Sequence, residues 1–148
     1  MYFGHLIKSV SKKYKKIPIS GISFDSRKVK KKNIFFAIQG NKISGTEFIN
    51  DAILKGASAV VSDKKIKYKI PFVLVKNVRK SLAEASSKFY KKKPSNIIAV
   101  TGTNGKSSVS DFFYQILSLN KIPVASIGTL GILSKKFKKK FYLTSLDP

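Results

Sequence analysis

Glycine, lysine and hydroxyl residues are concentrated in one short stretch, residues 96–108, with the sequence NIIAVTGTNGKSS. An apolar run at 97–100 is followed by Gly102 and Gly105, and then by Lys106 and two serines. Glycines let a backbone curl so that several N–H groups point at one anion. A helix that begins directly afterwards adds a partial positive charge of about half a unit. The stretch therefore predicts a phosphate-binding loop between a strand and a helix.

The helix after this loop is predicted from the spacing of its apolar residues. They recur at i, i+3 and i+4 positions, at Val109, Phe112, Phe113, Ile116 and Leu117. We expect the helix to place this apolar face in a core. Where a strand, a glycine loop, a Lys-Ser pair and a helix follow in this order, as in a P-loop, Lys106 would reach the β- and γ-phosphates of a nucleotide. The Ser107 hydroxyl would ligate Mg²⁺.

The strict P-loop pattern, G-x-x-x-x-G-K-[ST], is not met. It requires a glycine five residues before Gly105, and that position is Val100. The context of strand and helix is the confirming feature of such a motif. A glycine-rich turn with a solvated Lys106 remains the alternative.

The charge of the chain is strongly positive, with 30 Lys+Arg against 7 Asp+Glu and a formal net charge of +23. Such an excess attracts nucleic acid or anionic lipid. However, only Arg27 and Arg79 are arginine, and the lysines are spread over the whole chain, as AT-rich coding would produce on any fold. Because a nucleic-acid footprint is clustered, we expect no nucleic-acid partner. A functional basic surface remains the alternative.

The composition also limits the class of protein. The 148 residues suffice for one ordinary domain or two small ones, and there is no cysteine, which excludes disulfides and thiolate metal sites. The apolar runs are far shorter than the ~18–20 residues that span a bilayer. The first residues carry no small-residue cleavage site. We therefore expect a cytoplasmic protein with no membrane span.

Hydrophobic spacing divides the chain before residue 91 into short elements. Helices are expected over residues 2–14, 47–55 and 78–90. Strands are expected over residues 17–24, 33–39, 59–62 and 71–75. We expect Thr46 to cap the N-terminus of the middle helix and Asn77 that of the third. The middle helix is expected to end at Gly56 and to turn Phe48, Ala52 and Ile53 inward.

A charged run that ends in proline, residues 91–95, predicts a domain boundary. We expect an α/β domain over residues 1–93 and the start of a doubly wound parallel-sheet domain over 94–148. In the second part, a strand at 123–127 would complete a right-handed parallel crossover, and 128–143 would form a hairpin around the lysines at 135–140. Because this part is so small, we expect the chain to be the front of a longer protein or a truncated product.

Several motifs resemble, in their order, those of the Mur ligases, the ATP-dependent amide-forming enzymes of peptidoglycan precursor synthesis. They are FDSRKV at 24–29, NIFFAIQG at 33–40, SGTEFINDAILKGASAVV at 44–61, RKSLAEASSKFY at 79–90, TGTNGKSS at 101–108, SIGTLG at 126–131 and LTSLDP at 143–148. The last three are most similar to the branch that adds diaminopimelate or lysine to UDP-N-acetylmuramoyl-L-alanyl-D-glutamate. The resemblance implies a UDP-muramoyl-binding domain followed by an ATP-binding P-loop domain.

The resemblance also implies roles for individual residues. ATP would be bound by Gly102, Thr103, Asn104, Gly105, Lys106, Ser107 and Ser108. The UDP-muramoyl substrate would contact Phe24, Ser26, Asn41, Lys42 and Ile43, and its peptide would contact Thr144 and Ser145. As the alternative, residues 25–27 could be only a turn, and residues 144–145 only a strand end, because Asp, Ser and Thr favour such positions through local hydrogen bonds.

The reaction of the family forms an acyl phosphate on the substrate carboxylate, which an amine then attacks. Lys106 would be its catalytic residue here, with Mg²⁺ on Ser107. Three positions depart from the family: Ser107 and Ser108 replace a pair of threonines, which keeps the hydroxyls, and Ser44 replaces an aspartate. We expect a monomer without ligase activity on its own. A non-catalytic nucleotide-binding fragment and a sister Mur ligase that adds another residue remain alternatives.

Overall fold

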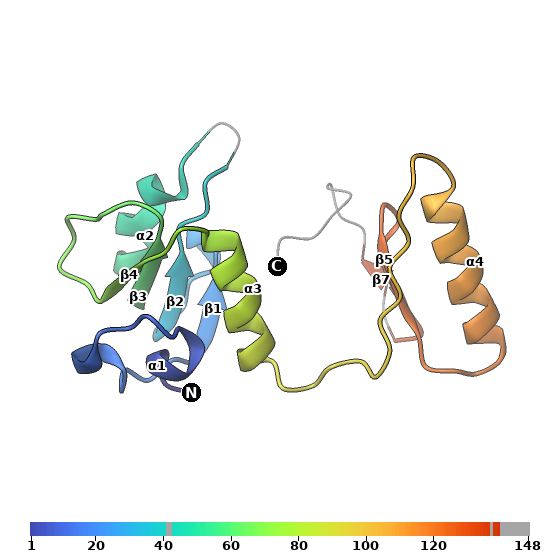
Figure 1. Ribbon diagram of the computed structural model, residues 1–148, viewed down its shortest axis with the longest axis horizontal. Helices are drawn as coiled ribbons and strands as arrows, with labels where there is room; N and C mark the ends of the chain where they lie inside the picture. The colour runs from blue at the N-terminus through green and yellow to red at the C-terminus, as the bar shows by residue number, and fades with distance from the viewer. Residues whose placement is uncertain (41–42, 137, 140–148) are drawn as a thin grey trace. The chain divides into compact units, whose positions relative to one another are not determined.

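The computed structural model describes residues 1–40, 43–136 and 138–139. The chain divides into two compact units, Met1–Lys93 and a second that begins at Pro94. Figure 1 shows both, with the first unit drawn from blue to yellow-green. The α/β fold class predicted from the sequence is confirmed, and each unit is described by itself.

The first unit is built on a four-stranded parallel sheet in the order β1-β2-β3-β4. The strands are β1 (Gly21–Ser23), β2 (Asn33–Phe36), β3 (Ala57–Ser62) and β4 (Phe72–Leu74). All four predicted strands are therefore present, although each apart from β3 is shorter than expected. All four residues of β2 are buried. A parallel sheet that is covered on both faces has this continuous apolar character.

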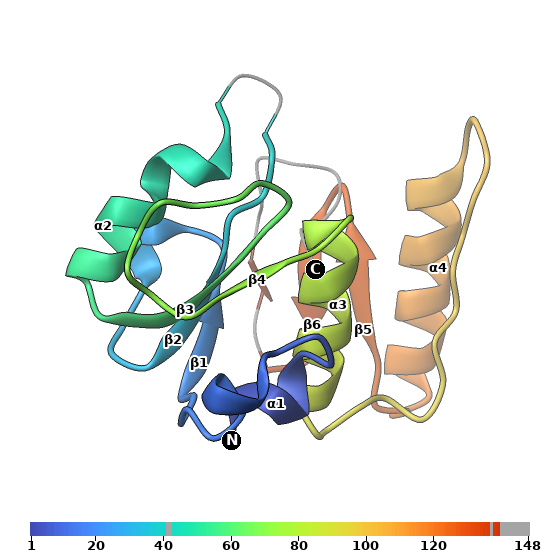
Figure 2. The same ribbon diagram turned by 60° about the vertical axis from the view of Figure 1, so that its left-hand side comes forward.

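Alternate residues of the central strands supply two separate cores. Ile34, Phe36 and Val61 belong to one cluster, and Phe35 and Val60 belong to the other. Because successive side chains of a strand point to opposite faces, these are the two faces of the sheet. Helix α2 (Ile49–Leu54) covers one face, and α1 (Phe3–Leu6) and α3 (Val78–Phe89) lie on the other (Figure 2).

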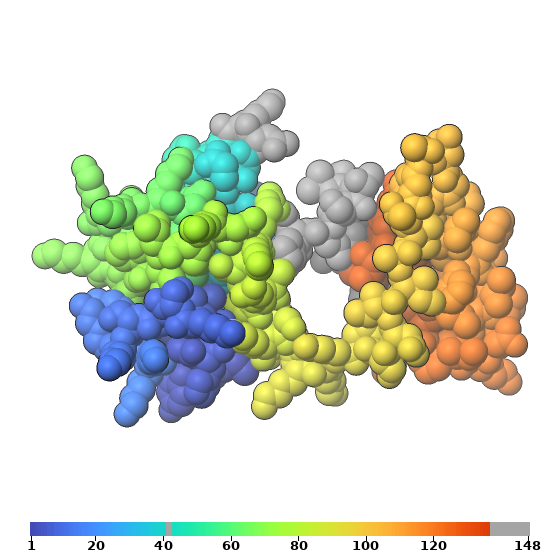
Figure 3. Space-filling model, in the orientation of Figure 1, coloured from blue at the N-terminus to red at the C-terminus, as the bar shows by residue number. Residues whose placement is uncertain are grey.

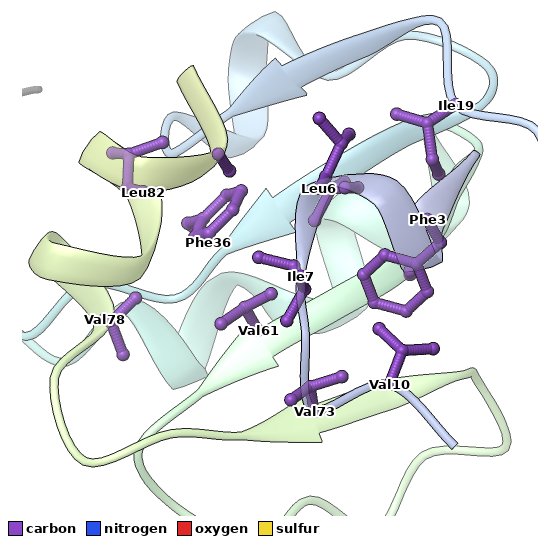
Figure 4. Packing of buried hydrophobic residues seen from close by; sticks show 13 residues of the cluster. Phe3, Leu6, Ile7, Val10, Ile19, Phe36, Val61, Val73, Val78 and Leu82 are labelled. Atoms are coloured by element: carbon purple, nitrogen blue, oxygen red, sulfur yellow. The ribbon is translucent and has the colours of Figure 1, made fainter. Parts of the chain in front are cut away.

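The larger core joins the N-terminal segment to the sheet and to α3. Leu6 and Ile7 point towards Phe36 and Val61, and Leu82 of α3 closes the cluster (Figure 4). Phe3, Leu6, Phe36 and Leu82 are at most 1% exposed. In the space-filling view, helices and loops cover the sheet of this unit (Figure 3).

The N-terminal helix is shorter than the prediction of 2–14. Helix α1 ends at Leu6, and a 3-10 turn η1 (Lys12–Tyr14) follows. Backbone bonds from Phe3 N–H to Ile17 O (2.9 Å) and from Gly4 N–H to Lys15 O (3.0 Å) fold the segment back on itself. These bonds hold apolar residues in the core without a continued helix.

Local capping signals set the ends of the other helices. Asn77 Oδ1 accepts the Lys80 N–H (2.9 Å), which confirms Asn77 as the N-cap of α3. The predicted cap Thr46 is wrong, because Ser44 caps the 3-10 turn η3 (Gly45–Phe48) that leads into α2. In return, the backbone N–H of Ser44 donates to Glu47 Oε1 (3.2 Å). This reciprocal arrangement is a capping box.

The inward face of α2 also differs from the prediction. Ala52 is fully buried and Ile53 packs against the core, as predicted, but Phe48 is 39% exposed and Ile49 is buried instead. The 3-10 turn ends at Phe48, so the helical register begins one residue later than expected. Gly56 ends the element with φ +94°, as predicted.

The second unit contains helix α4 (Lys106–Leu119) and an antiparallel sheet in the order β5-β6-β7. Its strands are β5 (Ala125–Gly128), β6 (Gly131–Ser134) and β7 (Lys138–Lys139). Residues 97–100 form no strand, so the expected parallel crossover to β5 is wrong. A strand needs a neighbour for its hydrogen bonds, and residues 97–100 have none within the described part of the chain. Residues 141–143, predicted to form the returning strand, lie outside the described residues.

The core prediction for α4 is also wrong within this chain. The structure buries no residue of α4, and Phe112, Phe113 and Ile116 are 62%, 41% and 58% exposed. The helical spacing itself is confirmed, since α4 begins at Lys106 and its C-cap is Asn120. What is missing is a second layer over this face among the described residues.

Among the described residues, no helix is both long enough and apolar enough to cross a membrane.

Candidate functional site

The loop before α4 depends on two glycines with positive φ. Gly105, the N-cap residue, has φ +75°, and Gly102 has φ +150°. A Cβ at Gly105 would meet no atom within 4 Å, and one at Gly102 would come no closer than 3.7 Å. The requirement for glycine at Gly105 therefore comes from its left-handed backbone and not from lack of space.

No side chain caps the start of α4, in contrast to α3, which Asn77 caps. The first N–H groups of a helix have no partner inside the helix. At α4 these groups belong to residues that are all exposed, Lys106, Ser107 and Ser108 among them. An uncapped helix start with exposed N–H groups is suited to bind an anion.

The Lys106 side chain folds back over this loop. Its Nζ donates to the Gly102 carbonyl and to the Thr103 carbonyl, the latter at 3.1 Å. An ammonium group has three donors, so one remains for another acceptor. The structure thus places the cation of Lys106 at the loop and not out along the helix.

Ser107 connects the loop to the hairpin between β5 and β6. Its Oγ donates to Thr129 Oγ1 at 3.4 Å, and one turn later Ser110 and Ser126 share a hydroxyl bond of 3.1 Å. A hydroxyl oxygen still has a lone pair for a hard cation. Among the described residues, no group of three or more His, Cys, Asp or Glu side chains could hold a metal. The residues present therefore fit Mg²⁺ carried by nucleotide phosphates, and not a separate protein cage.

The second predicted site follows β1. Asp25 accepts the Arg27 backbone N–H at 3.0 Å, and it also accepts from Arg27 Nε at 2.9 Å and from Nη2 at 3.0 Å. Ser23 Oγ donates to the Asp25 carbonyl at 2.8 Å. The hydrogen bonds from Arg27, more than the burial that opposes them, hold the pKa of Asp25 below its usual value, and Asp25 raises the pKa of Arg27. These bonds build the short turn η2 (Ser26–Lys28).

The two predicted substrate residues of this turn differ in access. Phe24 is 44% exposed, while Ser26 is 7% exposed. Phe24 can therefore offer a ring face to a ligand, whereas Ser26 offers little surface. Residues 25–27 do form a turn, but a turn of this kind is compatible with ligand binding, so the substrate role of Phe24 and Ser26 stays a prediction.

The loop after β2 leaves the same edge of the sheet, because β1 and β2 are neighbouring parallel strands. Its base is closed by a bond from Gly40 N–H to Ile43 O (3.1 Å), and Ile43 is 50% exposed. Asn41 and Lys42 lie outside the described residues. Ser44, two residues after Lys42, is the N-cap of the 3-10 turn η3. Serine and aspartate are both good N-caps, so a capping role for Ser44 is compatible with the aspartate that the resemblance leads one to expect there.

Gly45 beside this loop is required for space. A Cβ there would lie 2.5 Å from the backbone nitrogen and oxygen of Ile38. Gly45 N–H also donates to Ile38 O at 2.9 Å. The loop is therefore tied to the end of β2 by a contact that only glycine permits.

Thr144 and Ser145 lie outside the described residues, so their predicted role stays a prediction. The sequence interpretation missed the hydroxyl contacts of Thr129 and Ser126, which only the folded hairpin brings to α4. It also missed the bidentate contact of Asp25 with Arg27. An aspartate two residues before an arginine within a predicted turn was the available signal for that contact.

Comparisons with known proteins agree with the sequence resemblance. A family model described as "Mur ligase family, catalytic domain" matches residues 18–100. A UDP-N-acetylmuramoyl-L-alanyl-D-glutamate–2,6-diaminopimelate ligase of Rickettsia montanensis is 46% identical over 129 residues, which cover 86% of this chain and 26% of that protein. The ligase of the same name from Rickettsia conorii is 50% identical over 115 residues, which cover 77% of this chain and 24% of that protein.

A solved structure of a UDP-N-acetylmuramoyl-L-alanyl-D-glutamate–2,6-diaminopimelate ligase is similar in fold. It has a TM-score of 0.76 and 27% identity, and the match covers 93% of this chain and 29% of that one. The chain thus spans about a quarter of the length of the curated relatives it matches. Since the family model covers more than half of the residues, the chain belongs to the Mur ligase family.

Proposed function

We propose that this chain supplies the substrate-nucleotide and ATP-phosphate sites of an ATP-dependent ligase of peptidoglycan precursor synthesis. The ligase joins diaminopimelate to UDP-N-acetylmuramoyl-L-alanyl-D-glutamate. The relatives are named as diaminopimelate ligases, which supports diaminopimelate over lysine as the amine. A sister reaction of the family is the alternative.

One observation carries the proposal: α4 begins without a side-chain cap at a left-handed glycine, and Lys106 lies over the same loop. This arrangement leaves backbone N–H groups and one ammonium donor for phosphate oxygens. ATP binding is accordingly assigned to residues 102–108. Mg²⁺ would be held between the nucleotide phosphates and Ser107.

The two parts of the chain have separate roles in this proposal. Residues 1–93 bind the UDP-muramoyl substrate at the carboxyl edge of the parallel sheet, through Phe24, Ser26 and the loop at 41–43. Residues 94–148 begin the ATP-binding domain, with Thr144 and Ser145 on the peptide side of the substrate. In parallel sheets, ligands generally bind at the carboxyl ends of the strands.

The chemistry assigned to Lys106 is charge neutralisation. A carboxylate becomes a good electrophile when the γ-phosphoryl group of ATP is transferred to one of its oxygens and ADP leaves. The amine then attacks the carbonyl carbon, and phosphate departs. Because phosphoryl transfer depends mainly on positioning and on neutralising the phosphoryl oxygens, the ammonium of Lys106 and the loop N–H groups suit the first step.

The 148-residue chain is expected to bind without turnover. It covers only about a quarter of its relatives, so the remaining groups of the site would come from the rest of a longer protein. The cytoplasmic location and the monomeric state predicted from the sequence belong to the same proposal.

Isothermal titration calorimetry with ATP·Mg²⁺ and with UDP-N-acetylmuramoyl-L-alanyl-D-glutamate tests the proposal. We expect heats of binding for both ligands and no tripeptide product when diaminopimelate is added. Absence of binding for both ligands to a folded chain would refute the proposed function. Product formation by the purified chain would refute its inactivity.

A further inference from the structure

Strand β4 lies at an edge of the parallel sheet, and β3 is its one neighbour among the described residues (Figure 1). Val60 N–H donates to Pro71 O at 3.0 Å, and Val75 N–H donates to Ser62 O at 2.9 Å. Successive residues of a strand direct their backbone groups to opposite sides. Phe72 and Leu74 therefore direct their N–H and C=O groups away from β3, where no strand of the described part of the chain accepts or donates.

A pocket of about 480 Å³ opens at the amino end of β4. Tyr14, Tyr68 and Phe72 supply aromatic surface, and Ile70 and Pro71 supply aliphatic surface. Tyr14 packs against the larger core, and Ile70 and Phe72 pack against the smaller one, so both walls are anchored in the fold. A concave apolar pocket of this kind can hold a large side chain of a partner.

This pocket is separate from the residues assigned to ATP and to the UDP-muramoyl substrate. It lies where β4 begins, whereas the proposed substrate residues follow the carboxyl ends of β1 and β2. In a parallel sheet these are opposite ends of the strands. The pocket therefore needs a ligand of its own.

Lysines surround the pocket and the edge strand. Lys13 and Lys69 line the pocket, and Lys13 Nζ lies 4.6 Å from the centre of the Tyr14 ring. Residues 63–77 contain five lysines and one carboxylate, Asp63. Within the described residues, the recorded salt bridges all involve Asp25, so neither lysine of the pocket has a carboxylate partner. Cations beside apolar surface favour a partner that is both acidic and apolar.

The backbone of β4 favours an extended peptide over a small anion. An extended segment can add a strand to a sheet edge through main-chain hydrogen bonds, and pockets then select its alternate side chains. A second copy of this chain is disfavoured, because each copy carries a net charge of +23 and two lysine-rich edges repel each other. Lysines protect an edge strand from unspecific pairing, but they attract an acidic strand.

We propose that β4 is a docking edge for an extended acidic peptide segment of a partner protein. The segment pairs with the outward backbone groups of Phe72 and Leu74 and places an aromatic or aliphatic side chain in the pocket. Lys13 and Lys69 contact its carboxylates. The docking edge goes beyond the proposed function and stands or falls independently of it.

Fluorescence anisotropy with the 148-residue chain tests the proposal. The probe is a fluorescein-labelled peptide of sequence EVEFEVE, in which acidic and apolar residues alternate with the period of a strand. Its neutral twin, QVQFQVQ, keeps the apolar residues and the strand period. We expect saturable binding of the acidic peptide and at least about tenfold weaker binding of the twin, a difference that added salt reduces.

A proline substitution separates strand pairing from side-chain contact. Leu74→Pro removes an outward N–H and breaks no bond to β3, since proline is tolerated at edge positions whose N–H faces solvent. It should weaken binding of EVEFEVE by about 3- to 10-fold, the range for one lost hydrogen bond. Leu74→Ala is the matched control, because it keeps the N–H and should lose less affinity. Circular dichroism verifies that each variant is folded.

A charge reversal separates this site from general attraction to a basic protein. The double variant Lys13→Glu with Lys69→Glu should weaken binding at least about tenfold. Lys30→Glu with Lys91→Glu changes the net charge equally at exposed positions outside the pocket, and should change the affinity much less.

Three results would overturn the docking edge. Equal losses in the two double variants would show attraction by net charge alone. Undiminished binding by folded Leu74→Pro would remove the strand pairing, and if that variant does not fold, the two charge reversals still decide whether the site is used. A dimer of the peptide-free chain in sedimentation that Leu74→Pro dissociates would make a second copy the occupant.

Discussion

The two units of this chain differ in how their structure is maintained. In the first, a parallel sheet is buried on both faces, and β2 has no exposed residue. In the second, α4 has no buried residue, and its side chains of Phe112 and Phe113 are exposed. The first unit therefore has the buried core of a self-sufficient domain. In the second unit, the loop before α4 takes its shape from the backbone conformation of its glycines and not from a packed core.

The same contrast holds for two helix starts. Asn77 satisfies an N–H group of α3, and the start of α4 has a glycine and no side-chain cap. A capped start favours stability, and an uncapped start in a glycine loop leaves donors for a ligand. This difference is the reason for proposing that α4, and not α3, binds the phosphates of a ligand.

The largest expected effect sharpens the comparison of the cores. Phe36→Ala should lower the free energy of unfolding of the first unit by about 3–5 kcal/mol, because Phe36 is fully buried. Phe112→Ala removes a phenyl ring that is 62% exposed, and should change the free energy of unfolding by less than about 0.5 kcal/mol. Urea unfolding followed by circular dichroism measures both, and equal losses would remove the distinction between the units.

An intermediate effect tests the glycine loop. Gly105→Ala places a Cβ at φ +75° and should cost about 1–2 kcal/mol of local strain, which reduces ATP·Mg²⁺ affinity by about tenfold. Gly128→Ala is the matched control, because its Cβ would meet no atom within 4 Å and its φ is not in the left-handed region. Calorimetry compares the two, and unchanged binding by Gly105→Ala would contradict the role given to its backbone.

The smallest expected effect is a pH dependence in the first unit. The pKa of Asp25 is lowered from its ordinary value of 3.8, so its bonds to Arg27 stabilise the fold fully above about pH 4. This contribution is lost as the pH falls through the lowered pKa. The small stability difference between wild type and Asp25→Asn should therefore be present at pH 6 and vanish in strong acid. A difference that grew on acidification would show that the pair does not stabilise the turn.

Sequence patterns predicted the features that depend on neighbouring residues. Asn77 and Gly56 were identified correctly, since a cap and a left-handed stop need only local geometry. The error at Thr46 was avoidable, because Ser44 and Glu47 have the S-x-x-E spacing of a capping box.

Features that need a distant partner were predicted less well. Residues 97–100 have a strand composition, but no neighbouring strand pairs with them in the described part of the chain. Phe112 has the spacing of a core residue, but spacing does not show whether a second layer is present. The contact of Ser107 with Thr129 could not be predicted, because it depends on how the β5–β6 hairpin folds against α4.

The most direct test of the phosphate loop is an amide NMR titration of the ¹⁵N-labelled chain with ATP·Mg²⁺. We expect saturable shifts in the amides of residues 102–108, with little change at the Asn77-capped start of α3, and loss of those shifts in Lys106→Ala. A folded wild-type chain whose loop amides do not respond to ATP·Mg²⁺, or respond equally in Lys106→Ala, would contradict the account.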